Sequence, residues 1–528
     1  MQTFDYIVIG AGSAGCALSA RLAAAGKQVL LLEAGPADNH PYIHIPGTFI
    51  RVHGTQRTWM YRTEPEPFVN QRRVYIPQGR TLGGGSSVNA MIYIRGQAED
   101  YDEWQANGCP GWGWADVLPV FRRCEANARL GGQLHGQDGP LKVSDPRHRH
   151  ALSEAFVQAA VEAGVPATDD FNGAKQEGAG FYQTTTAEGR RASSAVSYLR
   201  PLRHDPRLKV LSNTHVTELL FEGQRVVGVR AKGQQGDALE FKARAEVIVS
   251  AGAIASPKLL MLSGIGPGEH LQSLGIRTRV DAPGVGENFQ DHLSASVYAQ
   301  TREPASLLGH DRGLRAIGHG LKYLATRRGL LSSNVVESGA FVDATGCGRP
   351  DVQFHVVPAL VGDMDRLPPS GHGISINPCA LRPRSRGRLR LKSADPMQEV
   401  AINANYLSDP EDMRTMVAGV KVARRILRSP ALASVVEKML LLPDHDDVPD
   451  SVFEDYVRTV AKTVFHPAGT CRMGQDAGAV VGPDLKVHGV EGLRVADASI
   501  MPTIVSGNTN APSIMIGERC ADFILAAG

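Results

Sequence analysis

A single histidine near the carboxyl end of the chain is the first candidate for chemistry. His466 lies between an apolar run and a loop rich in proline and glycine. A neutral imidazole accepts a proton at working pH, so His466 could be a catalytic base. It could also bind a metal together with Cys471, or only fill a loop. Because a metal site needs three or four converging ligands, these two residues predict none. Whether His466 is a base or a loop residue depends on the rest of the chain.

The amino-terminal residues carry the spacing of a phosphate-binding turn. A short apolar run at 7–9 leads into Gly10, Gly12 and Gly15, and small apolar residues follow. Gly10 permits the tight turn, Gly12 lets a pyrophosphate approach the backbone, and Gly15 lets the following helix pack closely on the strand. The start of that helix supplies free N–H groups and the positive end of its dipole. This pattern predicts a bound dinucleotide.

A second apolar run narrows the class of dinucleotide. It covers residues 29–32 and ends in Glu33, about twenty residues beyond the first glycine of the turn. A carboxylate at this position accepts hydrogen bonds from ribose hydroxyls and disfavours a 2′-phosphate. We therefore expect FAD or NAD rather than NADP.

Later segments extend the expected sheet and its loops. Residues 79–89 form a loop of glycines and serines that could hold a flat ring or a phosphate, or be a mobile linker. Residues 247–249 form another apolar strand, followed by a helix with Pro257 in its first turn, where proline is favoured. Near the carboxyl end, Asp497 ends a strand, which is a usual place for cofactor contacts.

Together these segments resemble the glucose–methanol–choline (GMC) family of FAD oxidoreductases. The resemblance rests on the loop at 79–89, the segment 252–266 and the pair formed by His466 and Asn510, and it covers nearly the whole chain. It implies that FAD is the cofactor.

Within the family, the chain is most similar to bacterial dehydrogenases of L-sorbose, polyethylene glycol, primary alcohols and choline, through segments 333–341 and 381–387. The resemblance also implies a set of FAD-binding residues: Gly10, Gly12, Ser13, Ala14, Gly15, Glu33, Ala34, Arg80, Leu82, Gly83, Gly84, Ser87, Asn89, Ala90, Met91, Val216, Ala251, Gly252, Asp497, Ala498, Asn508 and Thr509.

The resemblance further implies that His466 and Asn510 face the flavin across the substrate. His466 would take the hydroxyl proton of an alcohol while the hydride passes to flavin N5, and Asn510 would hydrogen-bond the alcohol oxygen. Asn510 is also expected to cap a helix that begins near Ser513. Some relatives attach FAD through a histidine just before Asn89. Here that residue is Val88, so we predict non-covalent FAD.

The order of the segments predicts an α/β fold, α+β overall. A Rossmann-like FAD-binding domain is expected from residues 1–155, 190–295 and 455–528, the last part carrying the candidate catalytic pair. A second, substrate-binding domain is expected at 296–454, where the dinucleotide-like segments stop, built on an antiparallel sheet flanked by helices.

Two residues of the expected substrate domain are candidates for substrate contact, by resemblance to choline-oxidising relatives. Residues 351–357 alternate along a predicted strand, which turns His355 to a face that could cover an active site. Glu337 could contact the substrate or be paired within the fold, and the same two possibilities hold for His355. Basic residues alternate over 382–392 and predict a hairpin with one basic face, for which solvation is favoured over an anion or a partner.

The overall composition limits the kinds of partner and the cellular compartment that we expect for this protein. The 528 residues exceed one ordinary core, so two or more domains are expected. A net charge of +2 argues against nucleic acid and against an anionic membrane as the main partner. Seven scattered cysteines favour a reducing compartment. With no signal peptide and no apolar run of about 18 residues, we expect a cytoplasmic protein with at most peripheral contact at the inner membrane.

These expectations converge on an FAD-dependent dehydrogenase that oxidises a primary alcohol, polyol or sugar and passes the electrons to a quinone, cytochrome or dye-like acceptor. One alternative is an oxidase that uses O₂. Another is an enzyme of the hydroxynitrile lyase type, with flavin as scaffold only, which Asn510 in place of a second histidine disfavours. A cofactor-binding protein without catalysis is disfavoured because His466 and Asn510 are both present.

Overall fold

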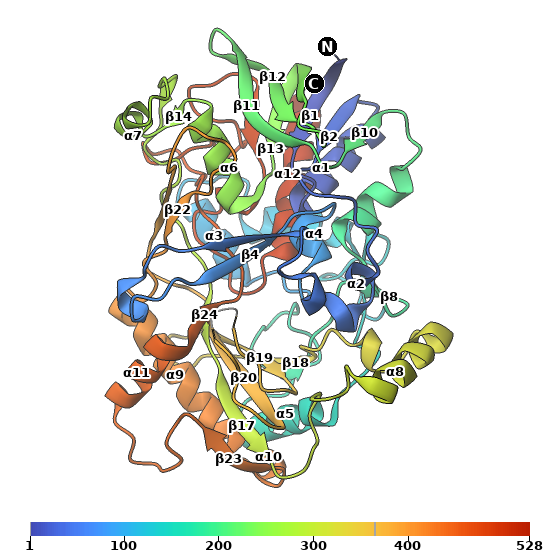
Figure 1. The fold of residues 1–528 in the computed structure, drawn as a ribbon, viewed down its shortest axis with the longest axis vertical. Coiled ribbons are helices and arrows are strands. Elements are labelled where there is room, and N and C mark those ends of the chain that lie inside the picture. Colours follow the sequence, from blue (N-terminus) through green and yellow to red (C-terminus); the bar gives the residue numbers. More distant parts are fainter. Residues whose placement is uncertain (1, 364–365, 528) are drawn as a thin grey trace.

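Two sheets, one above the other in Figure 1, organise the chain in a computed structural model that describes residues 2–363 and 366–527. Within those residues the upper sheet has the strand order β10-β2-β1-β13-β12-β11, with β25 beside β13. Its strands are β1 (Gln2–Ile9), β2 (Val29–Leu32), β10 (Leu208–Leu211), β11 (His215–Glu222), β12 (Arg225–Lys232), β13 (Ala238–Val249) and β25 (Leu493–Val495).

The centre of the upper sheet is parallel, as the apolar runs predict. Strand β1 pairs in parallel with β2 and with β13, and β13 pairs in parallel with β25, whereas β11 and β12 are antiparallel. All four residues of β2 are buried, as expected for a strand covered on both faces. Helix α1 (Ser13–Ala24) follows the glycine turn and packs against α12 (Asn510–Ala527). The strand, turn and helix predicted at the amino terminus are confirmed.

The lower sheet is antiparallel throughout its pairings. Helices α5 (Ala151–Glu162) and α9 (Pro410–Leu427) pack on it, so the predicted antiparallel sheet with flanking helices is confirmed. Its strands are β7 (Gly178–Phe181), β16 (Leu293–Ala295), β17 (Val297–Thr301), β18 (Ser338–Val342), β19 (Val352–Val357), β20 (Gly373–Ala380), β23 (Val436–Leu440) and β24 (Ala461–Thr463). Because β7, β16 and β24 belong to this sheet, we propose that the substrate-binding domain extends beyond 296–454 to include them.

The remaining helices and strands lie outside the two large sheets. The remaining α-helices are α2 (Pro41–His44), α3 (Ala98–Ala106), α4 (Trp114–Cys124), α6 (Gly252–Leu262), α7 (Gly268–Ser273), α8 (Gly313–Thr326), α10 (Pro430–Ala433) and α11 (Asp450–Val460). The remaining strands are β3 (Thr58–Arg62), β4 (Tyr75–Gly79), β5 (Glu125–Asn127), β6 (Leu141–Val143), β8 (Thr186–Ala187), β9 (Arg190–Arg191), β14 (Ile265–Gly266), β15 (Val280–Asp281), β21 (Arg388–Arg390) and β22 (Ala401–Asn403). Of the helices in the described ranges, none is both long and apolar enough to cross a membrane.

Two helix boundaries differ from the predictions. Pro257 lies inside α6 and not in its first turn, because the helix already begins at Gly252 after the tight turn that follows β13. Helix α12 begins at Asn510 and not near Ser513.

The predicted basic hairpin over 382–392 is wrong. Strand β21 pairs with β22, which lies outside that segment. The turn after β20 is instead held by Asp412, whose carboxylate accepts hydrogen bonds from the backbone amides of Arg384 and Ser385 at 2.7 and 2.9 Å. The basic side chains of this segment also have separate partners. Arg382 donates to the Pro350 carbonyl at 2.6 Å, whereas Lys392 pairs with the carboxylate of Glu64. The segment therefore has no single basic face.

Candidate active site

A cavity of about 790 Å³ is lined by residues of both sheets and of the loops that join them. That volume is at the upper end of the range for ligand sites. Most of the residues predicted for the site line it: Gly10, Gly12, Ser13, Ala14, Glu33, Ala34, Gly84, Asn89, Ala90, Met91, Val216, Ala251, Gly252, His355, His466, Asp497, Ala498, Asn508, Thr509 and Asn510.

Six predicted residues, all in the described part of the chain, lie outside the lining: Gly15, Arg80, Leu82, Gly83, Ser87 and Glu337. Several of the first five contact residues that line the cavity or belong to the loop at 79–89. A Cβ on Gly15 would lie 2.0 Å from the Gly10 carbonyl oxygen, so this glycine serves the close packing of helix and strand. The Arg80 guanidinium stacks on Trp59, and the Ser87 hydroxyl donates to the Leu82 carbonyl at 2.7 Å.

The backbone of the cavity wall fits a flat, phosphate-bearing cofactor. Gly85 and Gly252 line the cavity, and a Cβ on either would meet no protein atom within 4 Å. Their bare backbone therefore faces open space, where a ring or a pyrophosphate can approach closely. A Cβ on Gly10 would lie 2.4 Å from the Ser250 carbonyl oxygen, so only glycine fits that turn, at φ +97°.

Glu33 is placed for ribose hydroxyls at the end of β2. Its carboxylate accepts hydrogen bonds from the backbone amides of Ala11 at 3.0 Å and Gly35 at 2.8 Å. Burial raises the pKa of Glu33 to about 7, although those amides oppose the shift. Each oxygen keeps a lone pair that a hydroxyl could use.

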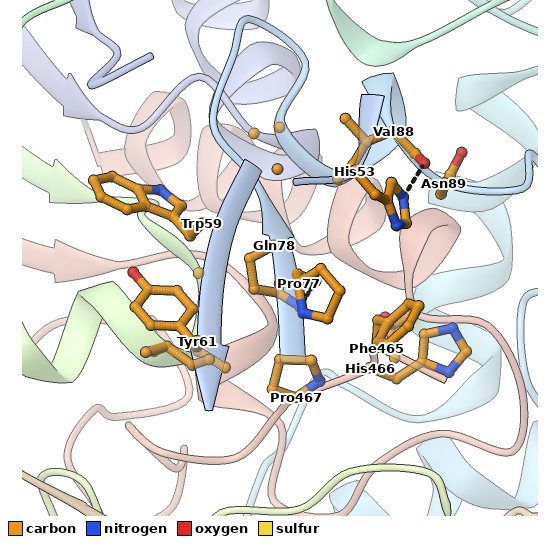
Figure 2. A pocket seen from close by; sticks show the side chains of 18 of the residues that line it. His53, Trp59, Tyr61, Pro77, Gln78, Val88, Asn89, Phe465, His466 and Pro467 are labelled. Carbon is orange, nitrogen blue, oxygen red and sulfur yellow. Dashed lines mark hydrogen bonds between the residues drawn. The ribbon is translucent and has the colours of Figure 1, made fainter. Parts of the chain in front are cut away.

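The loop at 79–89 is fixed by a buried arginine that the sequence analysis did not single out. Arg191 donates to the Ser86 carbonyl at 2.9 Å and to the side-chain and backbone oxygens of Asn89 at 2.7 and 2.8 Å. Burial lowers the pKa of Arg191 to about 9. Figure 2 shows the next anchor, where Nε2 of His53 donates to the Val88 carbonyl at 3.1 Å. These bonds anchor the loop to the fold, as expected of a cavity wall and not of a mobile linker.

His466 is held by a second histidine, also missed from the sequence. Its Nδ1 lies 3.0 Å from Nδ1 of His292, and Nε2 of His292 lies 2.9 Å from the Leu381 carbonyl oxygen. Because a carbonyl only accepts, Nε2 of His292 carries the hydrogen and its Nδ1 is the acceptor in the neutral ring. Nδ1 of His466 must then donate. The two rings therefore leave Nε2 of His466 unprotonated, with a lone pair that can accept a proton.

The surroundings keep both rings neutral. Burial lowers the pKa of His466 well below its ordinary value, and the nearby His292 and His355 lower it further. Burial also lowers the pKa of His292 to about 4, against the opposing effect of its bond to the Leu381 carbonyl. His466 is thus in the form that accepts a proton at neutral pH.

The backbone at His466 is fixed by Asp291, whose Oδ1 accepts from the His466 amide at 2.9 Å. Its Oδ2 accepts from the hydroxyls of Tyr406, at 2.8 Å, and Thr463. Burial raises the pKa of Asp291 to about 6. Phe465 has φ +70°, a conformation that costs about 1–3 kcal/mol for a residue other than glycine. The hydrogen bonds of Asp291 therefore stabilise the strained backbone that leads into His466.

Two asparagines near the start of α12 line the cavity, and Asn508 is the one beside His466. Nδ2 of Asn508 lies 3.3 Å from Nε2 of His466, and Oδ1 of Asn508 accepts from Gln353 at 3.1 Å. Asn510 lines the same cavity, but it opens α12 and its Oδ1 accepts from the Ser13 hydroxyl at 2.7 Å. Asn508, assigned above to the cofactor, is therefore the asparagine within hydrogen-bond distance of His466, and the role expected of Asn510 toward the alcohol oxygen stays a prediction.

Of the two substrate candidates, His355 lines the cavity and Glu337 does not. Within the described residues, Nδ1 of His355 is buried with no hydrogen-bond partner, and burial lowers its pKa to about 3. Glu337 accepts from His148 Nδ1 at 2.9 Å, from the His150 amide at 2.6 Å and from the Ser333 hydroxyl. Burial pushes its pKa upward, but these bonds outweigh burial and hold the pKa below its ordinary value. The carboxylate of Glu337 is thus paired within the fold, which is one of the two possibilities that the sequence left open, and its contact with substrate stays a prediction.

Comparison with known proteins places these features in one family. Two family models described as GMC oxidoreductase match residues 4–294 and 383–517. The chain is 44% identical to an alcohol dehydrogenase [acceptor] of Pseudomonas putida, over 99% of this chain and 96% of the relative. It is 42% identical to the mitochondrial choline dehydrogenase of Homo sapiens, over 99% and 89%. A formate oxidase structure from Aspergillus oryzae RIB40, determined to study FAD modification, aligns with a TM-score of 0.93, 27% identity and coverage of 100% and 98%.

Proposed function

The chain belongs to the GMC oxidoreductase family and is an FAD-dependent enzyme that oxidises alcohols, and we propose that His466 is the base of this reaction. Gly12, Glu33 and Gly252 would hold the cofactor, through bare backbone at the phosphates and a carboxylate at the ribose. When bound, FAD supplies the acceptor for the hydride that leaves the alcohol carbon. Because Val88 precedes Asn89, we propose that it is held non-covalently.

The hydrogen bond between His292 and His466 carries the proposal. It leaves Nε2 of His466 as the atom that takes the hydroxyl proton. His466 then becomes an imidazolium whose Nδ1–H still donates to His292. A positioned base of this kind contributes about 10²–10⁴-fold to the rate.

Asn508 is the second group that we propose for the reaction. Its Nδ2 can donate to the alcohol oxygen as that oxygen gains negative charge. The bond from Gln353 to its Oδ1 fixes the amide in this orientation. His355, with its buried and unpartnered Nδ1 among the described residues, is proposed to contact the substrate.

Apolar groups near His466 favour a primary alcohol with an apolar substituent. The rings of Phe49 and His53 are 6.2 Å apart, those of His53 and Phe465 are 6.0 Å apart, and all three residues line the cavity. Val335 and Val336 add aliphatic surface. Choline is the second candidate, because of the 42% identity to a choline dehydrogenase. The carboxylate of Glu337, occupied within the fold, would not be available to its cationic head group.

The substrate class can be tested by the visible spectrum of the anaerobic protein. Medium-chain primary alcohols, polyols, sugars and choline are added one at a time, and flavin absorbance is followed. We expect the bands to bleach fastest with an apolar primary alcohol. Bleaching by choline or a sugar alone would contradict the proposed substrate, whereas no bleaching with any alcohol would contradict alcohol oxidation itself.

The alcohol's electrons go to an electron acceptor, for which we propose a quinone. A cytochrome and O₂ are the competing candidates, and readmitting air to the bleached enzyme tests O₂. A bleached flavin would exclude the lyase reaction, in which flavin is scaffold only. We also propose a cytoplasmic protein whose contact with the inner membrane is peripheral.

A further inference from the structure

Helix α8 (Gly313–Thr326) carries four large apolar side chains that the fold leaves exposed. Leu314 is 86% exposed, Ile317 59%, Leu321 64% and Leu324 67%. Their spacing places them on one face of the helix, because residues three or four positions apart are neighbours. An apolar surface of this size on a surface helix marks an interaction site. Figure 1 shows α8 projecting from the side of the lower half of the molecule.

The opposite side of α8 attaches it to the protein. Tyr323 is buried, and its hydroxyl donates to the Gly189 carbonyl at 2.9 Å. The Arg327 guanidinium lies over the Tyr323 ring, and α8 also contacts η6 (Leu330–Ser332). The apolar face is therefore held outward by a fixed attachment.

Basic residues are concentrated in and next to α8 although the whole chain is nearly neutral. The segment from 308 to 328 contains five arginines and lysines and one carboxylate, which belongs to Asp311. The basic residues are Arg312, Arg315, Lys322, Arg327 and Arg328. A helix with an apolar face and basic flanks is the structure that lies in the interface of a bilayer carrying anionic lipids.

The attachment of α8 also connects it to a wall of the cavity. Arg51 pairs with Asp311 at 3.8 Å, just before α8, and Arg51 belongs to the 3₁₀ helix η1 (Pro46–Val52). Helix η1 contacts η6 as well, and its Phe49 and Ile50 line the cavity. Ile50 is 60% exposed, so the part of the cavity wall that η1 forms also presents apolar surface to the outside.

We propose that the apolar face of α8, with its basic flanks, docks the protein on an anionic membrane surface beside the cavity. The proposed contact with lipid is supported by the exposed apolar and basic residues of α8 alone. The purpose of this docking rests on the proposed function. An acceptor dissolved in the bilayer would be within reach of the docked enzyme, for example a quinone that takes two electrons and two protons to become a quinol.

Sedimentation with vesicles tests the docking, using phosphatidylglycerol–phosphatidylcholine vesicles and pure phosphatidylcholine vesicles. The variants are Ile317→Glu and Leu321→Glu, with Leu441→Glu as the matched control because Leu441 is 65% exposed at a different place. We expect the unchanged protein to bind the anionic vesicles and to be released by high salt. Each α8 variant should bind at least ~10-fold more weakly, and the control should bind normally. All forms should oxidise alcohol equally with a water-soluble dye, which shows that they are folded.

The proposal is overturned if the unchanged protein binds neither kind of vesicle, or if Leu441→Glu weakens vesicle binding as much as the α8 variants do. It is also overturned if light scattering shows that the α8 variants convert a dimer to a monomer without a change in vesicle binding, since the face would then join two copies. Loss of dye-linked activity in every form, with vesicle binding intact, would instead contradict the proposed function.

Discussion

Replacing His292 tests how the base is prepared. His292→Leu removes the acceptor for Nδ1–H of His466, which is 3.0 Å away in a buried site. An unsatisfied buried donor costs about 1–3 kcal/mol. His466 can avoid this cost by moving its hydrogen to Nε2 and turning, which removes the base. Since 1.36 kcal/mol corresponds to tenfold in rate, kcat/KM should fall by about 5- to 150-fold.

His292→Asn is the matched variant. Its side-chain oxygen can accept the hydrogen bond from His466, and its amide can donate toward the Leu381 carbonyl. We expect His292→Asn to recover most of the activity. The assay is the steady-state rate with a soluble dye as a function of pH, together with the flavin content of each protein. A His292→Leu enzyme that is fully loaded with FAD and within twofold of the original kcat/KM would refute the reasoning.

Three further predictions concern other parts of the site. The neutral state of His355, with its pKa lowered to about 3 by burial, should destabilise the native state on acidification, because the unfolded state binds a proton from pH ~6.5 downward and the native state does not. Chemical denaturation of the original protein and of His355→Gln should therefore show the stability of the original falling relative to the variant by about 1.4 kcal/mol per pH unit between pH ~6 and ~4; parallel curves would contradict this. Glu33→Ala removes the carboxylate proposed to bind the ribose, and titration with FAD should show an affinity about 10- to 150-fold weaker. An unchanged affinity for FAD would contradict ribose binding by Glu33. Asn508→Ala should lower kcat about 10²-fold with FAD retained, as for loss of one donor to a developing oxyanion, whereas Asn510→Ala should weaken FAD binding and change kcat less; the reverse order would restore Asn510 as the partner of the base.

The cofactor half of the molecule could be predicted because its signals are local. Gly10, Gly12 and Gly15 lie within six residues of one another, and the turn, the strand and the helix they imply follow from backbone sterics alone. Glu33 follows from the same short unit. Each of these features needs no knowledge of distant contacts, and each is found where it was expected.

The catalytic half could be predicted only in part, because its roles arise from contacts between distant segments. His292 is 174 residues before His466 in the chain, and no spacing links them. Asn508 and Asn510 are two residues apart and chemically identical, and only the start of α12 decides which one reaches His466. The function of Glu337 depends on His148, almost two hundred residues away.

The most direct test of His466 as the base is the anaerobic reduction of the flavin by an alcohol, followed by stopped-flow absorbance, in the original enzyme and in His466→Ala. The variant should retain FAD, because the hydrogen bonds of His466 go to His292, Asp291 and Asn508 and not to the glycine turn or Glu33. It should be reduced at least ~10²-fold more slowly than the original. Reduction at a nearly unchanged rate would contradict the role of His466 and with it the mechanism proposed for this enzyme.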